Sequence, residues 1–378
     1  MTLRIVIDGL RLEGQRLGVG RYLEYLLREW ADAPEDDHYT VCVRRPLDDR
    51  AHFERGAVTV EDLWSRLPGY AWQTLRLGPA ARAGGDVLFG PSYRLPWRYR
   101  GPAVVAVHSV NEVERGAHDL GYRLTHARII RAGARAADRV IVPSRSTALD
   151  VERAYGVPAA KLVVIPQGAD QAFAPHADLE RDRAVRSRLL GDPDRPFVLW
   201  VGKLSQRRNI PMLIESFAAM RRAHGLDHHL LLFGPNHLEL PVASIAAQFG
   251  VGDAVVQTDG VVADHRDVAD VYRAADLYAS ASAYEGFSMT AVEALACGLP
   301  VVGVDRAGVA EIASGCALLV PEPSVDALAD AMYRGLTDEA LRADLRAKGL
   351  RRAEDFRWDD IARRTRQVLA DAVRERSP

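Results

Sequence analysis

Two glutamates lie eight positions apart in the stretch YEGFSMTAVEALACGLPVV, residues 284–302. Glu285 stands in a glycine-containing turn, and Glu293 falls inside the helical pattern that follows and stops at Gly298. Paired acids suggest glycoside hydrolysis, in which the two carboxylates flank the scissile bond roughly 5–10 Å apart. Here both acids belong to one motif around a helix start, where free N–H groups attract a phosphate. We therefore rank hydrolysis below binding of a phosphorylated ligand.

The residues between the two acids fit this interpretation. Gly286 allows the backbone to approach a ligand closely. The helix start is expected to present three amide groups to a phosphate, those of Phe287, Ser288 and Met289. The simpler alternative makes Glu285 a turn or capping acid and Glu293 a surface acid. That alternative is weakened because Glu293 stands among Ala, Val and Leu rather than on a polar face.

Cations follow another buried strand, in the stretch VGKLSQRRNIPMLIESF at 201–217. Lys203, Arg207 and Arg208 precede an amphipathic helical pattern. Such cations could clamp a diphosphate and stabilise the charge that develops on it as a bond breaks. A solvated basic turn is the alternative.

The first half of the chain offers weaker candidates. Gly18 and Gly20 precede a helical pattern after the first strand, but Leu23 occupies the third glycine position of a dinucleotide fingerprint. A flexible connection is the alternative for these glycines. His108 directly follows a buried strand, where a histidine can donate to a substrate hydroxyl or shuttle a proton. A hydrogen-bonded loop histidine is the alternative there.

The elements that position these residues show the same rhythm twice. Short apolar runs alternate with helical patterns, which predicts parallel sheets covered on both faces. The runs occupy 4–7, 39–43, 86–89, 103–107, 139–142 and 161–165, then 197–201, 229–233, 254–257, 277–281, 300–304 and 317–320. We expect two α/β domains, each a doubly wound parallel sheet, with the ligand site in the cleft between them.

The expected boundaries follow from composition. The predicted domains span 1–176 and 197–357, joined by a charged linker at 177–196. A last helix at about 358–376 could pack onto either domain. The acids Asp192 and Asp194 fall in the linker and are interpreted as a turn, not a metal site.

Composition narrows the function. The chain has 378 residues and a net charge of −2, so no global charge argues for nucleic-acid binding. No apolar run approaches the ~20 residues that span a bilayer, and the N-terminus lacks a signal-peptide pattern. Three cysteines without metal or disulfide spacing fit a reducing, cytoplasmic environment.

Together these residues carry a resemblance. EGFSMTAVE is similar to the E-x7-E motif of retaining glycosyltransferases of the GT-B fold, and the whole chain resembles glycosyltransferase family 4, also called group 1. Further segments carry the likeness in the same order: GVGRY, the histidine after the fourth strand, ADRVIVPSRST, KLVVIPQGAD, VGKLSQRRN, VYRAADLYASASAYEGF and ACGLPVV. The resemblance implies two Rossmann-like domains facing across a cleft, with the nucleotide-sugar donor on the C-terminal domain and the acceptor on the N-terminal one.

Roles are carried over residue by residue. The resemblance implies that Glu293 binds the ribose and Glu285 the donor sugar, while Arg208 and Lys203 meet the diphosphate. It implies that His108 lies near the reacting sugar, and that Gly18 and Gly20 approach the diphosphate. The same carry-over gives donor contacts to Gly286, Phe287, Ser288, Met289 and the loop of Gly260 to Val262. Catalytic roles thus fall to His108, Arg208 and Glu285.

The implied reaction moves a hexose-type sugar to a hydroxyl of a glycan, a glycolipid or a natural product. Fixed cations and helix amides would stabilise the charge that develops on the diphosphate, so no metal or other cofactor is expected. Retention is attributed to front-face attack with the leaving phosphate as the base, so no side-chain nucleophile is expected. Two departures from the family matter. Ser288-Met289-Thr290 replaces a common Gly-Leu-Pro, and Arg208 replaces a lysine. The "RRN" turn is similar to the mannosyltransferase-like branch, which favours GDP-mannose and leaves UDP-sugars open.

Two other functions stay open at this point. A catalytically silent nucleotide-sugar-binding partner would keep the same residues, and a nicotinamide-dependent dehydrogenase fits the sheets but lacks the glycine fingerprint. The basic stretch 121–139 is a candidate for peripheral membrane contact, with an ordinary solvated helix as the alternative.

Overall fold

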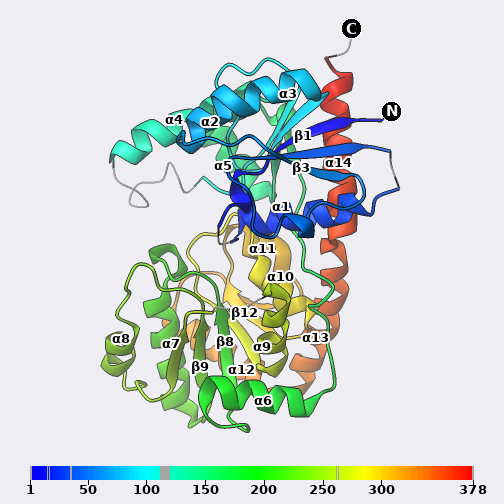
Figure 1. Ribbon diagram of the computed structural model, residues 1–378. Coiled ribbons are helices and arrows are strands. Elements are labelled where there is room, and N and C mark those ends of the chain that lie inside the picture. Colours follow the sequence, from blue (N-terminus) through cyan, green and yellow to red (C-terminus); the bar gives the residue numbers. More distant parts are fainter. Residues whose placement is uncertain are drawn as a thin grey trace. The chain divides into compact units, whose positions relative to one another are not determined.

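The computed structural model describes residues 2–14, 16, 18–34, 36–110, 120–260, 262 and 264–376, with the backbone alone for 120–125 (Figure 1). The chain divides into two compact units. Unit 1 comprises Met1–Gln167 with Trp358–Pro378, and unit 2 comprises Gly168–Arg357. Each unit is a parallel sheet with helices on its faces, so the prediction of two doubly wound α/β domains is confirmed.

Unit 1 contains a seven-stranded sheet in the order β3-β2-β1-β4-β5-β6-β7. Every pairing in it is parallel. Its strands are β1 (Arg4–Asp8), β2 (His38–Val43), β3 (Val58–Asp62), β4 (Val87–Gly90), β5 (Ala103–Ala106), β6 (Arg139–Val142) and β7 (Leu162–Val164). Its helices are α1 (Val19–Ala31), α2 (Gly69–Trp72), α3 (Gly78–Gly84), α4 (Leu120–Ala136), α5 (Arg145–Tyr155) and α14 (Trp358–Arg374).

The last helix, α14, completes unit 1 and packs against α1 and strands β4, β5 and β6 (Figure 1). Its inner face is fixed by specific polar contacts. Arg366 donates to the buried Asp37 carboxylate at 2.8 and 3.1 Å. Trp30 Nε1 donates to the Ala362 carbonyl at 3.1 Å. Burial alone would raise the pKa of Asp37, but the hydrogen bonds from Arg366 and from the Leu3 amide outweigh it and lower the pKa.

Unit 2 contains a six-stranded parallel sheet in the order β10-β9-β8-β11-β12-β13. Its strands are β8 (Phe197–Val201), β9 (His229–Phe233), β10 (Val255–Thr258), β11 (Leu277–Ser280), β12 (Val301–Val304) and β13 (Leu318–Val320). Its helices are α6 (Leu179–Leu190), α7 (Ile210–His224), α8 (Val242–Gln248), α9 (Val268–Ala274), α10 (Met289–Ala296), α11 (Ala307–Ala313), α12 (Val325–Thr337) and α13 (Glu339–Ala353). The order reverses between β8 and β11, which is where such sheets bind ligands.

The predicted linker needs a correction. The segment 177–196 belongs to unit 2, which begins at Gly168 rather than after 196. Most of the segment is helix α6, which packs against α9. Asp178 is the N-cap of α6, with its side chain accepting from the Arg181 amide, and Gly191 ends the helix in the left-handed conformation. High charge therefore marks an exposed helix face here, not a connection without structure.

Within the described chain, no helix is both long and apolar enough to cross a bilayer. The basic stretch 121–139 forms most of α4, and the side chains of its first five residues lie outside the described part. Of the others, Arg131 donates to the Ala154 carbonyl at 2.8 Å and Arg135 to the Tyr155 carbonyl at 2.6 Å. These two arginines tie α4 to α5, and membrane contact through this stretch stays a prediction.

Candidate functional site

The two loops that follow β8 and β11 lie next to each other in unit 2. The Ala283 amide donates to the Arg207 carbonyl at 2.9 Å, and Arg207 Nη1 donates to the Tyr284 carbonyl at 3.2 Å. The switch of strand order between β8 and β11 makes this adjacency possible, because the two strands are neighbours in the sheet although far apart in sequence. The cations predicted after β8 and the acid predicted after β11 therefore meet.

Arg208 and Glu285 form an ion pair at the centre of this junction. The Glu285 side chain is 1% exposed and that of Arg208 is 13% exposed. Burial and the neighbouring charge of Arg207 lower the pKa of Arg208 to about 9, which leaves the guanidinium charged at neutral pH. Arg208 Nε is buried without a hydrogen-bond partner among the described residues. A buried guanidinium with an unused donor is suited to bind an anionic ligand.

The turn after Glu285 is held from behind by helix α11. The Gly308 amide donates to the Glu285 carbonyl at 3.0 Å. A Cβ at Gly308 would come within 2.7 Å of the Gly286 carbonyl oxygen and 2.8 Å of Phe287 Cα. Only glycine at 308 therefore lets α11 support the turn this closely. Phe287 itself packs edge to face on Phe356, with ring centroids 5.9 Å apart.

Helix α10 begins directly after this turn. Ser288 is its N-cap residue, but the serine side chain makes no capping hydrogen bond. Instead the Ser288 hydroxyl lies 3.3 Å from Thr290 Oγ1, which in turn lies 2.8 Å from the Tyr278 hydroxyl. The first-turn amides of a helix have no partner within the helix. The amides at this helix start can therefore donate to a phosphate or sugar oxygen, as the sequence predicts for Phe287, Ser288 and Met289.

Glu293 is held inside unit 2 by two side chains. Its carboxylate accepts from Tyr272 at 2.8 Å and contacts His265 Nε2 at 2.9 Å, and its side chain is 1% exposed. Burial and the Glu293 charge raise the pKa of Tyr272 well above its ordinary value, so the tyrosine stays protonated and donates. The sequence-based search found neither His265 nor Tyr272. An acid inside an apolar helix needs a polar partner, and this need is the sequence signal that points to such residues.

Three glycines line the carboxyl ends of β8, β9 and β10. A Cβ at Gly234 would lie 1.9 Å from the Gly202 carbonyl oxygen, and one at Gly260 would lie 2.7 Å from Gly234 Cα. Gly234 also has a φ of 155°, which L side chains rarely adopt. The backbone segments after these strands thus touch each other, and the repeated strand–glycine pattern in the sequence is the signal for it.

The remaining unit 2 candidates are less engaged. Lys203 is exposed and makes no hydrogen bond or ion pair with the described residues. Val262 is partly buried against the apolar cluster on the α9 and α10 side of the sheet. The loop predicted to line the base, 260–262, is only partly described, because Val261 lies outside the described residues.

In unit 1, Gly18 is the N-cap of α1 and has a φ of 47°. Gly20 lies in the first turn of α1, where a Cβ would meet the Arg11 carbonyl oxygen at 2.8 Å. Gly20 therefore lets the start of α1 pack closely on the loop after β1, while Gly18 provides the positive φ before the helix. This local reason for the glycines holds whether or not they approach a ligand.

Both ring nitrogens of His108 are engaged within unit 1. Nε2 lies 2.8 Å from the Pro91 carbonyl oxygen, so it must carry the proton and donate. Nδ1 lies 2.8 Å from Gln167 Nε2 and accepts from that amide. Tyr22 and Tyr93 pack edge to face on the ring. The histidine is thus fixed and neutral, and its single N–H is already donated to Pro91, which suits a positioning role better than a proton shuttle.

We expect acid to destabilise the wild type more than a His108→Gln variant. Burial is the main cause that lowers the pKa of His108 from 6.5 to about 4. Between these pH values the unfolded chain binds a proton that the folded chain does not, so stability is full above pH 6.5 and falls toward pH 4. The loss is on the order of 2 kcal/mol. Thermal unfolding of both proteins at pH 7.5 and 4.5 tests this, and equal losses in Tm would contradict it.

A second buried acid of unit 1 escaped the sequence-based search. Asp8, at the carboxyl end of β1, is 3% exposed and accepts from the Leu10 amide at 3.1 Å and from Gln73 Nε2. Burial raises the pKa of Asp8. Gln73 Oε1 is buried without a partner among the described residues. The two side chains form a polar group at the point where the order of the unit 1 sheet switches between β1 and β4.

The arrangement in unit 2 brings together a buried cation, two buried acids and a helix start without a side-chain cap. They lie near the carboxyl ends of the central strands β8 and β11. The arrangement can bind a diphosphate and hold neighbouring hydroxyls. Among the described residues, no group of three or more His, Cys, Asp or Glu side chains is placed to bind a metal ion.

Comparison with known proteins gives matches over most of the chain. Residues 182–352 match the model of "Glycosyl transferases group 1", and residues 17–173 match that of "Glycosyltransferase Family 4". A D-inositol 3-phosphate glycosyltransferase of Salinispora arenicola is 31% identical over 349 residues, covering 85% of this chain and 77% of the relative. The O-antigen chain mannosyltransferase B of Escherichia coli is 23% identical over 280 residues, covering 74% and 72%.

Solved structures show the same fold. The sucrose-phosphate synthase from Thermosynechococcus elongatus superposes with a TM-score of 0.77 at 23% identity, covering 97% of this chain and 98% of that one. Anabaena Alr3699/HepE in complex with UDP-glucose gives a TM-score of 0.79 at 18% identity, covering 98% and 100%. The two Rossmann-like sheets of this chain therefore have the GT-B architecture.

Proposed function

We propose, from the premise that this chain belongs to the group 1 glycosyltransferases, that it transfers a hexose-type sugar from a nucleotide-diphosphate sugar to a hydroxyl with retention of anomeric configuration. The observation that carries the proposal is the junction of the loops after β8 and β11. There the buried Arg208–Glu285 pair stands beside the start of α10, whose N-cap side chain is not used for capping. A donor needs a charge partner, a sugar partner and a ribose partner, and unit 2 offers all three.

The diphosphate is assigned to Arg208 and the helix start. The buried, unused Nε of Arg208 is the donor that supports this assignment. Fixed cations and amides stabilise charge as it develops on a leaving group, without reorganising at the moment of reaction. Lys203, exposed in the same loop, supplies a second positive charge. The amides of Phe287, Ser288 and Met289 complete the set.

The two acids hold the donor at either end. Glu285 contacts hydroxyls of the transferred sugar, and its ion pair with Arg208 places that sugar next to the diphosphate. Glu293 accepts hydrogen bonds from the ribose hydroxyls, while Tyr272 and His265 hold its carboxylate in place. Neither acid needs to act as a nucleophile.

The reaction needs no reactant other than the donor and the acceptor. The bond from the anomeric carbon to the diphosphate oxygen breaks, and the pair of electrons leaves with the diphosphate. The acceptor oxygen then bonds to the anomeric carbon on the same face, and its proton passes to the leaving phosphate oxygen. The roles of His108, Gly18 and Gly20 in this step stay predictions from the family resemblance.

GDP-mannose is the first donor to test and a UDP-sugar the second. Relatives named as mannosyltransferases, including an α-(1→4)-mannosyltransferase of Mycolicibacterium hassiacum, support the first. The Anabaena structure with UDP-glucose supports the second. The acceptor is proposed to be a glycan, a glycolipid or a natural product, and peripheral membrane contact through 121–139 belongs to the glycolipid case.

A donor panel tests the proposal. We expect one of GDP-mannose, UDP-glucose and a dTDP-sugar to raise Tm by several degrees at saturating concentration, because a ligand at 100 times its Kd adds about 2.7 kcal/mol. The best binder is then assayed for transfer to a panel of glycan, glycolipid and natural-product acceptors, with the anomeric configuration of the product read by NMR. An inverted product would contradict retention, and no stabilisation by any sugar nucleotide would overturn the donor assignment.

The same panel separates the alternative of a catalytically silent partner protein. Such a protein would bind a sugar nucleotide but neither transfer nor hydrolyse its sugar. Slow hydrolysis of the bound donor in the absence of an acceptor, abolished in an Arg208 variant, would favour the enzyme.

A further inference from the structure

A short segment at the start of unit 2 packs against both side chains that hold Glu293. Phe173 is 4% exposed, although it stands outside every helix and strand. Its ring centroid lies 5.4 Å from that of His265 and 5.7 Å from that of Tyr272. Both of those side chains hydrogen-bond to the Glu293 carboxylate, at 2.9 and 2.8 Å. Phe173 is therefore one contact away from the buried acid.

Arg273 clamps the segment on both sides of Phe173. Its guanidinium donates to the carbonyl of Ala174 at 2.7 Å and to the carbonyl of Ala172. The same guanidinium pairs with Asp270 at 2.8 Å, which fixes its own orientation on α9. Arg273 directly follows Tyr272 in the chain, so the clamp and one of the Glu293 donors share a single helix. We call residues 172–174 the clamped segment.

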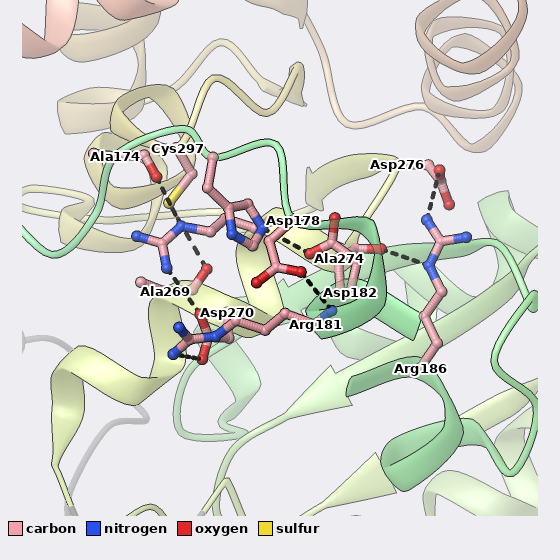
Figure 2. Close-up of polar contacts among 12 residues, drawn as sticks. Ala174, Asp178, Arg181, Asp182, Arg186, Ala269, Asp270, Ala274, Asp276 and Cys297 are labelled. Atoms are coloured by element: carbon pink, nitrogen blue, oxygen red, sulfur yellow. Dashed lines mark hydrogen bonds and ion pairs between the residues drawn. The ribbon is translucent and has the colours of Figure 1, made fainter. Parts of the chain in front are cut away.

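Helix α6 adds two further ties between the chain after the clamped segment and α9 (Figure 2). Figure 2 shows Arg181 beside Asp270, an ion pair of 2.6 Å, and Arg186 reaching toward the end of α9. Arg186 donates to the Ala274 carbonyl at 2.9 Å and contacts Asp276 at 3.2 Å. Both arginines keep part of their surface in water, so each tie is weaker than the clamp made by Arg273.

We propose that Phe173 is a positioning residue for the nucleotide-sugar donor, and that it acts through His265 and Tyr272 on Glu293. The proposal rests on the assignment of Glu293 to the ribose hydroxyls made above. A carboxylate offers about four acceptor positions. The direction from which Tyr272 and His265 approach Glu293 fixes how its carboxylate is oriented toward the ribose.

Packing supplies that direction. The His265 ring is partly exposed and stands at the start of the 3₁₀ turn before α9. The Phe173 ring packs against it, tilted by 41°, and the Arg273 clamp keeps Phe173 from moving away. A preorganised acceptor loses less entropy when it binds its ligand than one that must first be ordered. Removing the ring should thus weaken ribose recognition while leaving the diphosphate contacts intact.

The test measures ribose recognition directly. The probes are GDP and UDP together with their 2′-deoxy and 3′-deoxy forms, titrated by calorimetry so that no acceptor is needed. For the nucleotide that binds better, we expect Phe173→Leu to raise Kd about tenfold, the effect of losing one well-oriented hydrogen bond. Binding of the deoxy forms should change less than about twofold, so the preference of the protein for the ribonucleotide collapses.

A matched control separates positioning from loss of a buried ring. Phe217 on α7 is 0% exposed and belongs to the apolar cluster on the other side of the same sheet. Phe217→Leu should lower Tm by a similar amount and leave Kd and the ribonucleotide preference unchanged. If Phe173→Leu does not fold, Phe173→Met keeps the apolar volume without the ring face and is titrated in its place. A preserved ribonucleotide preference in the variant titrated would overturn the proposal.

The Glu293→Gln variant separates the positioning role of Phe173 from the assignment of Glu293 to the ribose. If Phe173 acts through Glu293, the double variant should lose no more ribonucleotide preference than Glu293→Gln alone. Losses that multiply would overturn the positioning role while leaving the ribose assignment intact. If Glu293→Gln binds the ribonucleotide and deoxy forms in the wild-type ratio, the ribose assignment itself fails.

Discussion

Replacing Arg208 with methionine is expected to lower kcat of sugar transfer by about 10²–10³-fold, the typical cost of removing one fixed group that stabilises developing charge. The structure gives the physical reason. The guanidinium is buried beside Glu285 and keeps an unused Nε donor. It needs no desolvation at the moment when negative charge appears on the leaving diphosphate.

The same substitution leaves the Glu285 carboxylate buried without its partner. Breaking a buried ion pair in this way costs about 3–5 kcal/mol, so the single variant could lose activity by unfolding. The Arg208→Met, Glu285→Gln double variant removes both charges and should regain most of the stability. Its kcat should stay at the level of the single variant or below.

Two measurements separate loss of catalysis from loss of folding: thermal unfolding and initial rates. They are made on the wild type, Arg208→Met, Glu285→Gln and the double variant. Arg208→Lys serves as the matched control, because it keeps the charge and loses the planar set of donors. It should retain more activity than Arg208→Met. Wild-type kcat in a folded Arg208→Met protein would exclude the proposed catalytic role.

Gly234→Ala is expected to destabilise unit 2 by about 3 kcal/mol or more, through backbone strain and a steric overlap together. A Cβ at this position would lie 1.9 Å from the Gly202 carbonyl oxygen, a backbone atom that cannot rotate away. The φ of 155° adds strain for any residue with a side chain. The loop after β9 would have to separate from the loop after β8.

Gly250→Ala is the control for this substitution. Gly250 has a φ of 73° and no atom within 4 Å of its virtual Cβ, so it probes the backbone conformation alone. Its replacement should cost about 1–2 kcal/mol. Thermal unfolding of both variants gives the comparison, with the Kd of the best nucleotide as a second measurement. Equal losses of Tm would show that the close contact between the two loops adds nothing to the cost of the substitution.

Most of the fold was predictable because both units rest on continuous apolar strands. FVLWV at 197–201 and HLLLF at 229–233 are strands with the predicted bounds. The strand β3, VTVED at 58–62, was missed. It pairs only with β2 at the sheet edge, and its exposed residues alternate with buried ones. A half-exposed edge strand has no continuous apolar run, so a search for such runs does not detect it.

The site was predictable in its parts and not in its connections. Arg208 and Glu285 were each singled out, but their ion pair depends on β8 and β11 being neighbours, and strand order is not encoded in either local motif. The partners of Glu293 depend in the same way on where α9 packs. For His108, the hydrogen bonds that join its two ring nitrogens to Pro91 and Gln167 depend on segments distant in sequence, so the local pattern does not encode them.

The discontinuity of unit 1 has a consequence for the order of events during synthesis. The ribosome makes residues 1–167 first, and they emerge without the cation that pairs with Asp37, since Arg366 follows more than three hundred residues later. Unit 2, by contrast, is one uninterrupted stretch that is complete before α14 exists. The half of the protein that is translated second is therefore the first whose native contacts can all form. Until α14 is synthesised, the side of the unit 1 sheet that α14 covers stays exposed. This helix of 17 residues completes the contacts of unit 1.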